Sequence, residues 1–277
     1  MIYLIAGACR IYKKPFKKFG NNGEDVIKMT PSNEDFSVIG DWLVNIISAS
    51  AINEISDVIK VMRHIDAALP NEDGLKWFNF LYLKVTESVR DNPPPLAWES
   101  PEFLNRLTVV FANLYLGALA NWHQNREAVA RAWNPLFEAR RRQGVKRVQF
   151  AIAGMNAHIN RDLGIALVET SEEFGIVPHR GSAQHRDFER VNDILVRVAE
   201  EVKQTLATGI VGEIDQDLGR VDDAVALWSV RKARETAWTN AEILWQIKDI
   251  PILADAFLIN LDRLVGLSSR GLLISVG

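Results

Sequence analysis

The sequence predicts an all-α fold, a single-domain bundle of about nine or ten helices around a central buried helix. Three observations support this prediction. Apolar residues recur at helical spacing along most of the chain after residue 35. No internal segment alternates apolar and polar residues as a strand does, and only the terminal segments 2–8 and 272–276 resemble strands. The segment 148–160 contains no charged residue, which is typical of a helix buried on all sides.

The first helices and loops can be located from residues that typically begin or end a helix. Residues 1–35 are expected to be irregular, because Lys, Gly, Asn and Pro cluster there without a sustained period. An amphipathic helix is predicted at 53–69, where Pro70 ends it, and Asp73 is a suitable cap for the next helix. The prolines at 93–95 then require an extended loop.

The later helices follow from similar signals. Ser100, Pro101 and Glu102 supply a capping residue, a first-turn proline and an acid near the positive end of a helix. No repeat or low-complexity linker interrupts the chain, so residues 36–277 are interpreted as one all-α domain. Helices are expected at 101–121, 125–142, 146–173, 184–208, 215–229, 230–248 and 251–267.

Composition narrows the class of partner. The net charge is −3 and the isoelectric point is near 6.0, which does not favour binding to nucleic acid. The single cysteine, Cys9, cannot form an internal disulfide and is typical of a reducing compartment. Positive charges follow the apolar run at the N-terminus, the reverse of the order in a secretory signal. We therefore expect a cytoplasmic protein.

The uncharged segment 107–125 is long enough to cross a bilayer, but it carries amides such as Asn113 and Asn121, which are costly in hydrocarbon. We expect a buried helix there and no integral membrane segment. Eight tryptophans and twelve phenylalanines can supply large apolar walls. The expected partner is therefore a small, partly apolar metabolite.

The central helix carries polar residues that need partners if they are buried, among them Asn156 and His158. His158 and Asp162 are four residues apart and share one helix face. Imidazole nitrogen and carboxylate oxygen are both ligands for zinc, manganese or iron. The same pair can also be a structural one, in which His158 simply bonds to Asp162.

Further candidates lie on later helices. His185 and Asp187 stand near the start of a long helix and can complete a metal site or act as a general base, although an acid is favoured at a helix start in any case. Arg234 and Trp238 are expected to bind the substrate, with Arg234 holding an anionic group, although Arg234 can also simply stack on a tryptophan such as Trp238. The predicted pocket is lined by Asn113, Asn156, His158, Asp162, Asp187 and Arg234.

The spacing of Asn192, Val196 and Glu200 resembles part of the magnesium-binding motif of class I terpenoid synthases, which presents three oxygen ligands at i, i+4 and i+8. Val196 cannot coordinate a metal, and no upstream aspartate-rich motif of the usual form is present. This resemblance implies an isoprenoid lyase or cyclase that uses magnesium.

A longer resemblance runs through six segments, at 77–82, 109–115, 132–137, 149–163, 187–192 and 233–238. Together they resemble a domain-of-unknown-function family found mainly in bacteria, especially actinobacteria, and in fungi. The resemblance covers residues 75–247 and is most specific in the sequence NAHINRDL at 156–163. It implies a helical fold and no particular reaction.

Several functions remain open on the sequence alone. The first is a metal-dependent hydrolase or lyase, with His158, Asp162 and Asp187 as ligands and Arg234 as the anion holder. The second is the isoprenoid enzyme. The third is a metal-free isomerase or cyclase that uses His158 and Asp162 as acid and base. The fourth is a binding or scaffold protein in which this pair is structural.

Overall fold

The computed structural model describes residues 42–47, 52–93, 97–207 and 229–275. These residues contain nine α-helices, a further helical segment at 42–47 and no strand, so the predicted all-α class is confirmed. The irregular segment predicted at 1–35 and the strand-like segment 2–8 lie outside the described residues. So does the helix predicted at 215–229, except for its last residue.

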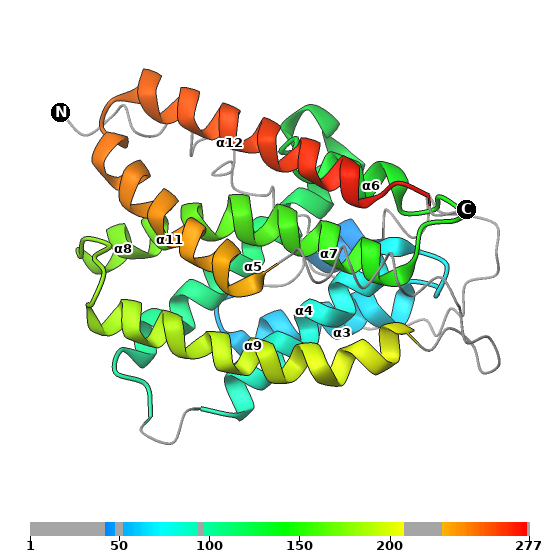
Figure 1. Ribbon diagram of the computed structural model, residues 1–277, viewed down its shortest axis with the longest axis horizontal. Coiled ribbons are helices and arrows are strands. Elements are labelled where there is room, and N and C mark those ends of the chain that lie inside the picture. The colour runs from blue at the N-terminus through cyan, green and yellow to red at the C-terminus, as the bar shows by residue number, and fades with distance from the viewer. Residues whose placement is uncertain (1–41, 48–51, 94–96, 208–228, 276–277) are drawn as a thin grey trace, which may run out of the picture.

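Figure 1 labels the α-helices named below and colours the chain by residue number from blue at the N-terminus to red at the C-terminus. Between α5 and α6 there is one short 3-10 turn, η1, and between α7 and α8 there is one π-helical turn, η2. The bounds are α3 Ile55–Ala68, α4 Gly74–Asp91, α5 Pro101–Gln124, η1 Arg126–Ala128, α6 Asn134–Ala139, α7 Arg147–Ala157, η2 His158–Leu163, α8 Gly164–Phe174, α9 Ala183–Ala207, α11 Val230–Ile247 and α12 Pro251–Leu272.

A continuous rod formed by α7, η2 and α8 runs through the middle of the bundle. In Figure 1, α12 runs along one side of this rod and α9 along the opposite side. The α7 part packs against α4 and α12, and the α8 part packs against α5 and α11. Every residue of α7 from Gln149 to Ala157 is buried. The predicted central buried helix is therefore present, and its lack of charge follows from contacts on all sides.

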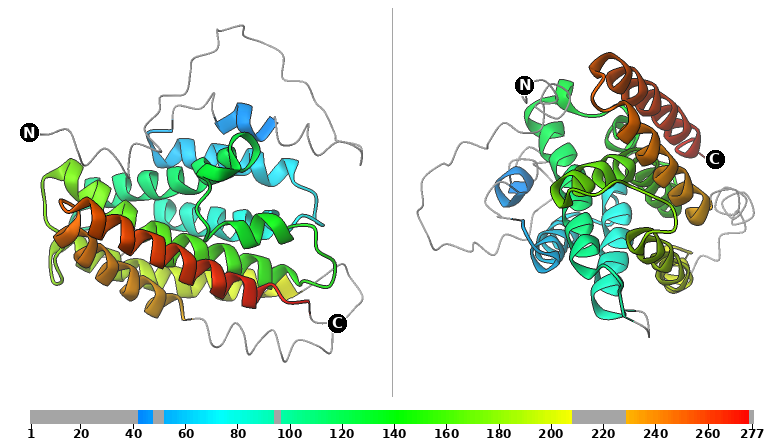
Figure 2. Two further views of the ribbon diagram at one scale, coloured as in Figure 1. Left: turned by 90° about the horizontal axis from the view of Figure 1, so that it is seen from above. Right: turned by 90° about the vertical axis from the view of Figure 1, so that its left-hand side faces the viewer.

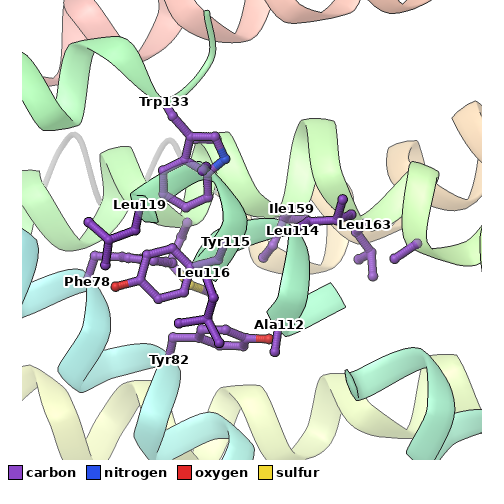
Figure 3. Close-up of a cluster of buried hydrophobic side chains, with 14 of the residues drawn as sticks. Phe78, Tyr82, Ala112, Leu114, Tyr115, Leu116, Leu119, Trp133, Ile159 and Leu163 are labelled. Carbon is purple, nitrogen blue, oxygen red and sulfur yellow. The ribbon is translucent and has the colours of Figure 1, made fainter. Parts of the chain in front are cut away.

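Aromatic side chains hold α4 and α5 against this rod (Figure 3). The ring of Phe78 lies 4.9 Å from that of Tyr115 and 5.3 Å from that of Trp133, measured between centroids. Gly154 of α7 faces Phe78, and a Cβ at this position would lie only 2.3 Å from the phenylalanine ring. A residue without a side chain is thus what allows α4 and α7 to approach so closely.

The single helix predicted at 125–142 is wrong. The structure has the 3-10 turn η1, a non-helical stretch and then the short α6. Asp262 accepts hydrogen bonds from the backbone amides of Arg131 (2.7 Å) and Ala132 (3.0 Å), which replace helical bonds there. Pro135 also lacks an amide donor and fits only the first turn of a helix.

Helix α5 contains the uncharged segment. Within the described parts of the chain it is the one helix long and apolar enough to cross a membrane by length and composition. However, 61% of its most apolar stretch is buried inside the protein. Its residues Leu116 and Leu119, for example, are fully enclosed in the core. The apolar character of α5 is therefore accounted for largely by packing between helices.

Candidate functional site

The central rod changes from α-helix to π-helix at His158 and returns to α-helix after Leu163. Such wider turns are rare and are frequently found at functional sites. Here the turn brings two fully buried side chains together, with Nδ1 of His158 3.1 Å from Oδ2 of Asp162. The predicted pairing of these residues on one face is thus observed.

The carboxylate of Asp162 is held by two further donors. The indole N–H of Trp133 donates to Oδ2 over 3.0 Å, and Nη1 of Arg161 donates to Oδ1 over 2.6 Å. Burial by itself raises the pKa of Asp162, but the charge of Arg161 and the contact with His158 outweigh it and hold the pKa below its usual value of 3.8. Asp162 is therefore an oriented carboxylate at neutral pH.

The imidazole of His158 is enclosed by aromatic rings. It lies flat on Phe111, with centroids 3.5 Å apart, and Tyr82 meets it edge to face at 4.6 Å. Burial lowers the pKa of His158 below its usual 6.5, and Asp162 offsets this only in part. The imidazole is therefore neutral at pH 7.

This geometry assigns the proton on the neutral ring. Because Asp162 accepts a hydrogen bond at Nδ1, that nitrogen carries the proton and Nε2 has a free lone pair. Nε2 is buried and has no hydrogen-bond partner among the described residues. The hydroxyl of Tyr82 is also buried without a hydrogen-bond partner among the described residues. The neighbouring Thr86 donates to the backbone carbonyl of Tyr82 (2.9 Å) and not to this hydroxyl. Burial raises the pKa of Tyr82, so its hydroxyl keeps its proton.

His158 and Tyr82 line a cavity of about 60 Å³ between α4, α5, the central rod and α9. Because Nδ1 of His158 is engaged by Asp162, Nε2 is the ring nitrogen left for a molecule in this cavity. Most of the remaining walls are apolar, and among the lining residues that the structure describes, Arg234 is the one that carries a charge. The other lining residues are Val85, Thr86, Val89, Leu104, Leu107, Thr108, Phe111, Met155, Ile159, Leu163, Phe188, Val191 and Leu195.

Arg234 reaches the cavity from α11. Its Nε donates to Oδ1 of Asn192 (2.8 Å), and its Nη2 donates to the backbone carbonyl of Phe188 (2.6 Å). Burial lowers the pKa of Arg234 to about 9. Within the described parts of the chain, no carboxylate forms an ion pair with this guanidinium. Arg234 thus carries a buried positive charge that its protein neighbours solvate with neutral oxygens.

The structure does not bring Asp187 to His158 and Asp162. Its two carboxylate oxygens accept the backbone amides of Glu99 (3.0 Å) and Ser100 (2.6 Å), just before α5, and Oδ1 also accepts from Arg190. Over the residues described, no group of three or more His, Cys, Asp or Glu side chains is arranged to hold one metal ion. Asp187 therefore acts as an anchor between α9 and α5.

His185 and Trp238 contact each other outside the cavity. Their rings meet edge to face at 4.7 Å, and Nδ1 of His185 accepts the backbone amide of Gly181 (3.2 Å). The indole of Trp238 is buried and donates to Glu242 (3.1 Å). Neither residue lines the cavity around His158.

The two asparagines expected in the pocket also lie elsewhere. Asn113 is exposed, and its amide is 3.4 Å from the backbone carbonyl of Ile52. Asn156 is buried and donates to the carbonyl of Val265 (3.1 Å) and to Oγ of Ser269 (2.9 Å). Asn156 therefore fixes α12 to the central rod. Of the six residues predicted to line the pocket, His158 and Arg234 do so.

The sequence analysis did not identify Tyr82, Phe111 and Trp133 as site residues. All three lie within segments that carry the family resemblance, and that was the one signal pointing to them. Their apolar rings look like ordinary core residues in a single sequence. Their place around His158 depends on contacts between distant helices, which spacing along the chain does not reveal.

A larger cleft of about 720 Å³ lies at α6 and the end of α5. Several of its polar groups already have protein partners. Arg140 binds the buried Asp73, Glu138 pairs with Arg270, and the guanidinium of Arg126 lies 4.4 Å above the ring of Trp122. The cleft borders neither His158 nor Arg234, so the smaller cavity is the better candidate for chemistry.

Comparison with known proteins gives one family. A family model described as a family of unknown function (DUF5995) matches residues 55–275. No curated protein and no solved structure gives a match. The matched range contains every residue of the cavity described above.

Proposed function

Since the chain belongs to this family of unknown function, which supplies no reaction, we propose from the site itself that the protein is an enzyme of the isomerase or cyclase type. In this proposal His158 exchanges a proton with a small apolar substrate. One observation carries it: Nε2 of His158 is buried without a partner beside a cavity, while Nδ1 is held by Asp162. The Trp133 and Arg161 donors further support a fixed carboxylate.

The arrangement suits general base catalysis followed by general acid catalysis. The neutral imidazole accepts a proton from the substrate at Nε2, and the Asp162 carboxylate stabilises the imidazolium that forms. The imidazolium then protonates another atom of the substrate, and in a fraction of the turnovers its Nε2 proton exchanges with solvent first. The apolar walls lower the local polarity, which strengthens the electrostatic interaction between His158 and Asp162.

The cavity and Arg234 together indicate the class of substrate. The apolar lining favours a hydrocarbon portion, and the buried guanidinium favours a carboxylate or another acidic group on the same molecule. The volume of about 60 Å³ is well below the ~150 Å³ cavity that holds a benzene ring. We therefore expect the cavity to take only the reacting end of the substrate unless α9 moves outward.

Solvent deuterium provides the test. The purified protein is incubated in D₂O with a small-molecule extract and the products are analysed by mass spectrometry. An isomerase or cyclase of this type leaves the formula unchanged but introduces deuterium into one metabolite, an apolar acid. His158→Gln should abolish this labelling, and His185→Gln, a matched histidine outside the cavity, should retain it.

Thermal unfolding of the same variants separates catalysis from a structural role. A folded His158→Gln protein that labels as fast as the wild type contradicts the proposal, and so does a wild type that labels nothing. In the second case a lowered melting temperature for His158→Gln favours the binding or scaffold protein, in which the pair is structural.

A divalent metal ion at the same pair is a second candidate. It is favoured by one distance, since Nδ1 of His158 and Oδ2 of Asp162 lie 3.1 Å apart and both are ligand atoms for zinc, manganese or iron. Elemental analysis of the purified protein tests it. One metal ion per chain, lost in both His158→Gln and Asp162→Asn, would favour the metal enzyme over the proposal above.

The isoprenoid enzyme has weaker support from the geometry. Asn192 is buried and bonded to Arg234, whereas Glu200 is exposed two turns further along α9. The two oxygen ligands therefore do not face one buried site. Incubation with prenyl diphosphates and magnesium tests this hypothesis directly, and unchanged diphosphates would remove it.

A further inference from the structure

Helix α12 carries a row of apolar side chains on its outer face. Leu253, Leu264 and Leu267 are 47%, 65% and 70% exposed, while Phe257 is half-buried and Asn260 is exposed. These five residues, called here the α12 stripe, follow one another at intervals of 4, 3, 4 and 3. An average spacing of 3.5 residues is typical of the contact line between two paired helices.

The stripe faces outward because the opposite face of α12 is fixed to the core. Asn156 of the central rod bonds to Val265 and Ser269 on that inner face. Gly266 packs against the chain at Arg131, where a Cβ would come within 2.8 Å of the backbone carbonyl oxygen. The two views of Figure 2 place α12 at the periphery of the molecule. Rotation of the helix to bury the stripe would break all of these contacts.

The stripe is nearly symmetric about Asn260. Leu253 and Leu267 lie seven residues to either side of Asn260, whereas Phe257 lies three residues before it and Leu264 four residues after it, an offset of one residue. We propose that a second copy of this chain covers the stripe, with the two α12 helices antiparallel and related by a two-fold axis at Asn260. Each leucine and phenylalanine then meets an apolar partner, and the two Asn260 amides bond to each other across the axis.

Charge favours this direction over a parallel pair. Arg263 and Arg270 flank the stripe, and in a parallel pair each would lie level with its own copy. The antiparallel arrangement places Arg263 level with Phe257, and Arg270 level with the turn at Asp249, which is 68% exposed at its side chain. Like charges are thereby separated and opposite charges are brought closer.

The size of the stripe sets the expected strength. A helix of 22 residues is about 33 Å long, so a contact strip about 10 Å wide covers less area than the roughly 800 Å² per partner of a standard interface. Neighbouring exposed residues Ile252 and Ile259 widen it. We therefore expect a dimer with a dissociation constant on the order of micromolar.

Sedimentation of the full chain from low to high micromolar concentration provides the first test. The wild type should pass from monomer to dimer over this range, and Leu264→Glu should remain a monomer with an unchanged melting temperature, because Leu264 is exposed. Val177→Glu, which changes an apolar residue that is 56% exposed outside α12, should still dimerise. A monomeric wild type, or a dimer that survives Leu264→Glu, would overturn the proposal.

Cysteine cross-linking in a Cys9→Ser background tests the direction of the pair. Asn260→Cys should form a disulfide between two copies under mild oxidation, since it lies on the axis. Leu253→Cys should not link to itself but should link to Leu267→Cys when the two variants are mixed. Self-linking of Leu253→Cys, with no product in the mixture, would show a parallel pair and refute the antiparallel one. The proposal does not depend on the chemistry assigned to His158, so each can fail separately.

Discussion

The imidazole of His158 lies parallel to the ring of Phe111, with 3.5 Å between the centroids and 4° between the planes. This contact fixes the plane of the imidazole, and the bond to Asp162 fixes its rotation within that plane. The direction of the Nε2 lone pair is therefore set by one residue of α5 and one of η2. A base that is oriented before substrate binds is what proton transfer requires.

The first prediction concerns stability against pH. Burial holds the pKa of folded His158 below 6.5, so the folded protein binds fewer protons at this site than the unfolded chain does. The contribution of neutral His158 to stability is complete above pH 6.5 and is lost as the pH falls from there toward the folded pKa. Across that window the free energy of unfolding should fall by up to ~1.4 kcal/mol per pH unit more in the wild type than in His158→Gln. Urea titrations at several pH values measure this difference, and parallel pH profiles for the two proteins would contradict it.

The second prediction concerns Asp162→Asn. An amide cannot accept from Trp133, Arg161 and His158 at once, so the imidazole loses its fixed tautomer and the developing positive charge loses its partner. Deuterium incorporation should fall by about 10⁴-fold, as expected when the carboxylate of such a pair is replaced. Near-ultraviolet circular dichroism serves to show that the variant is folded. A folded variant with the wild-type rate would exclude Asp162 from the chemistry.

The third prediction uses a pair of glycines. Gly154→Ala places a methyl group 2.3 Å from the ring of Phe78 and should lower the free energy of unfolding by about 1–3 kcal/mol. Gly117→Ala, in the helical interior of α5 with no atom within 4 Å of the added methyl group, should raise it by about 0.4–1 kcal/mol. Urea unfolding of both variants measures the two effects. Equal changes would show that the contact between α4 and α7 is looser than described.

The fourth prediction tests whether Asp187 has the structural role of joining α9 to α5 or is a metal ligand. Asp187→Ala leaves the amides of Glu99 and Ser100 without their acceptor and should cost about 1–3 kcal/mol of stability. Asp193→Ala removes an exposed ion pair with Arg231 and should cost less than about 1 kcal/mol. Thermal and urea unfolding provide the comparison. Loss of bound metal in Asp187→Ala, with stability unchanged, would restore Asp187 as a ligand.

Local signals in the sequence were sufficient for much of the fold. The absence of charged residues over 148–160 located the buried central helix, and Ser100 and Pro101 marked the start of α5 as the structure has it. The residues at 125–142 were predicted less well, because the side chain of Asp262, more than a hundred residues away, takes the amides of Arg131 and Ala132. Helix propensity contains no information about such a distant acceptor.

In the candidate site, too, contacts within one helix were predictable and contacts between distant residues were not. His158 and Asp162 were predicted together because they lie on one helix, where spacing determines proximity. Asp187 was expected beside them, but its carboxylate accepts hydrogen bonds from the backbone amides of Glu99 and Ser100. No pattern of side chains in the sequence predicts a contact with backbone amides. Trp133 and Phe111 reach His158 only through the packing of separate helices, so sequence spacing could not indicate them.

The wide turn at His158–Leu163 also puts the two halves of the rod out of phase. The π-helical turn closes over one residue more than an α-helical turn, so the face of α8 that meets α11 near Gly164 is offset from the face of α7 that meets α4. Removing one residue from the turn would restore a uniform helix. It would also rotate one half of the rod, so that either His158 would lose its contacts with the aromatic rings or α8 would lose its contacts with α11. The number of residues in η2 is therefore as important to the site as their identity.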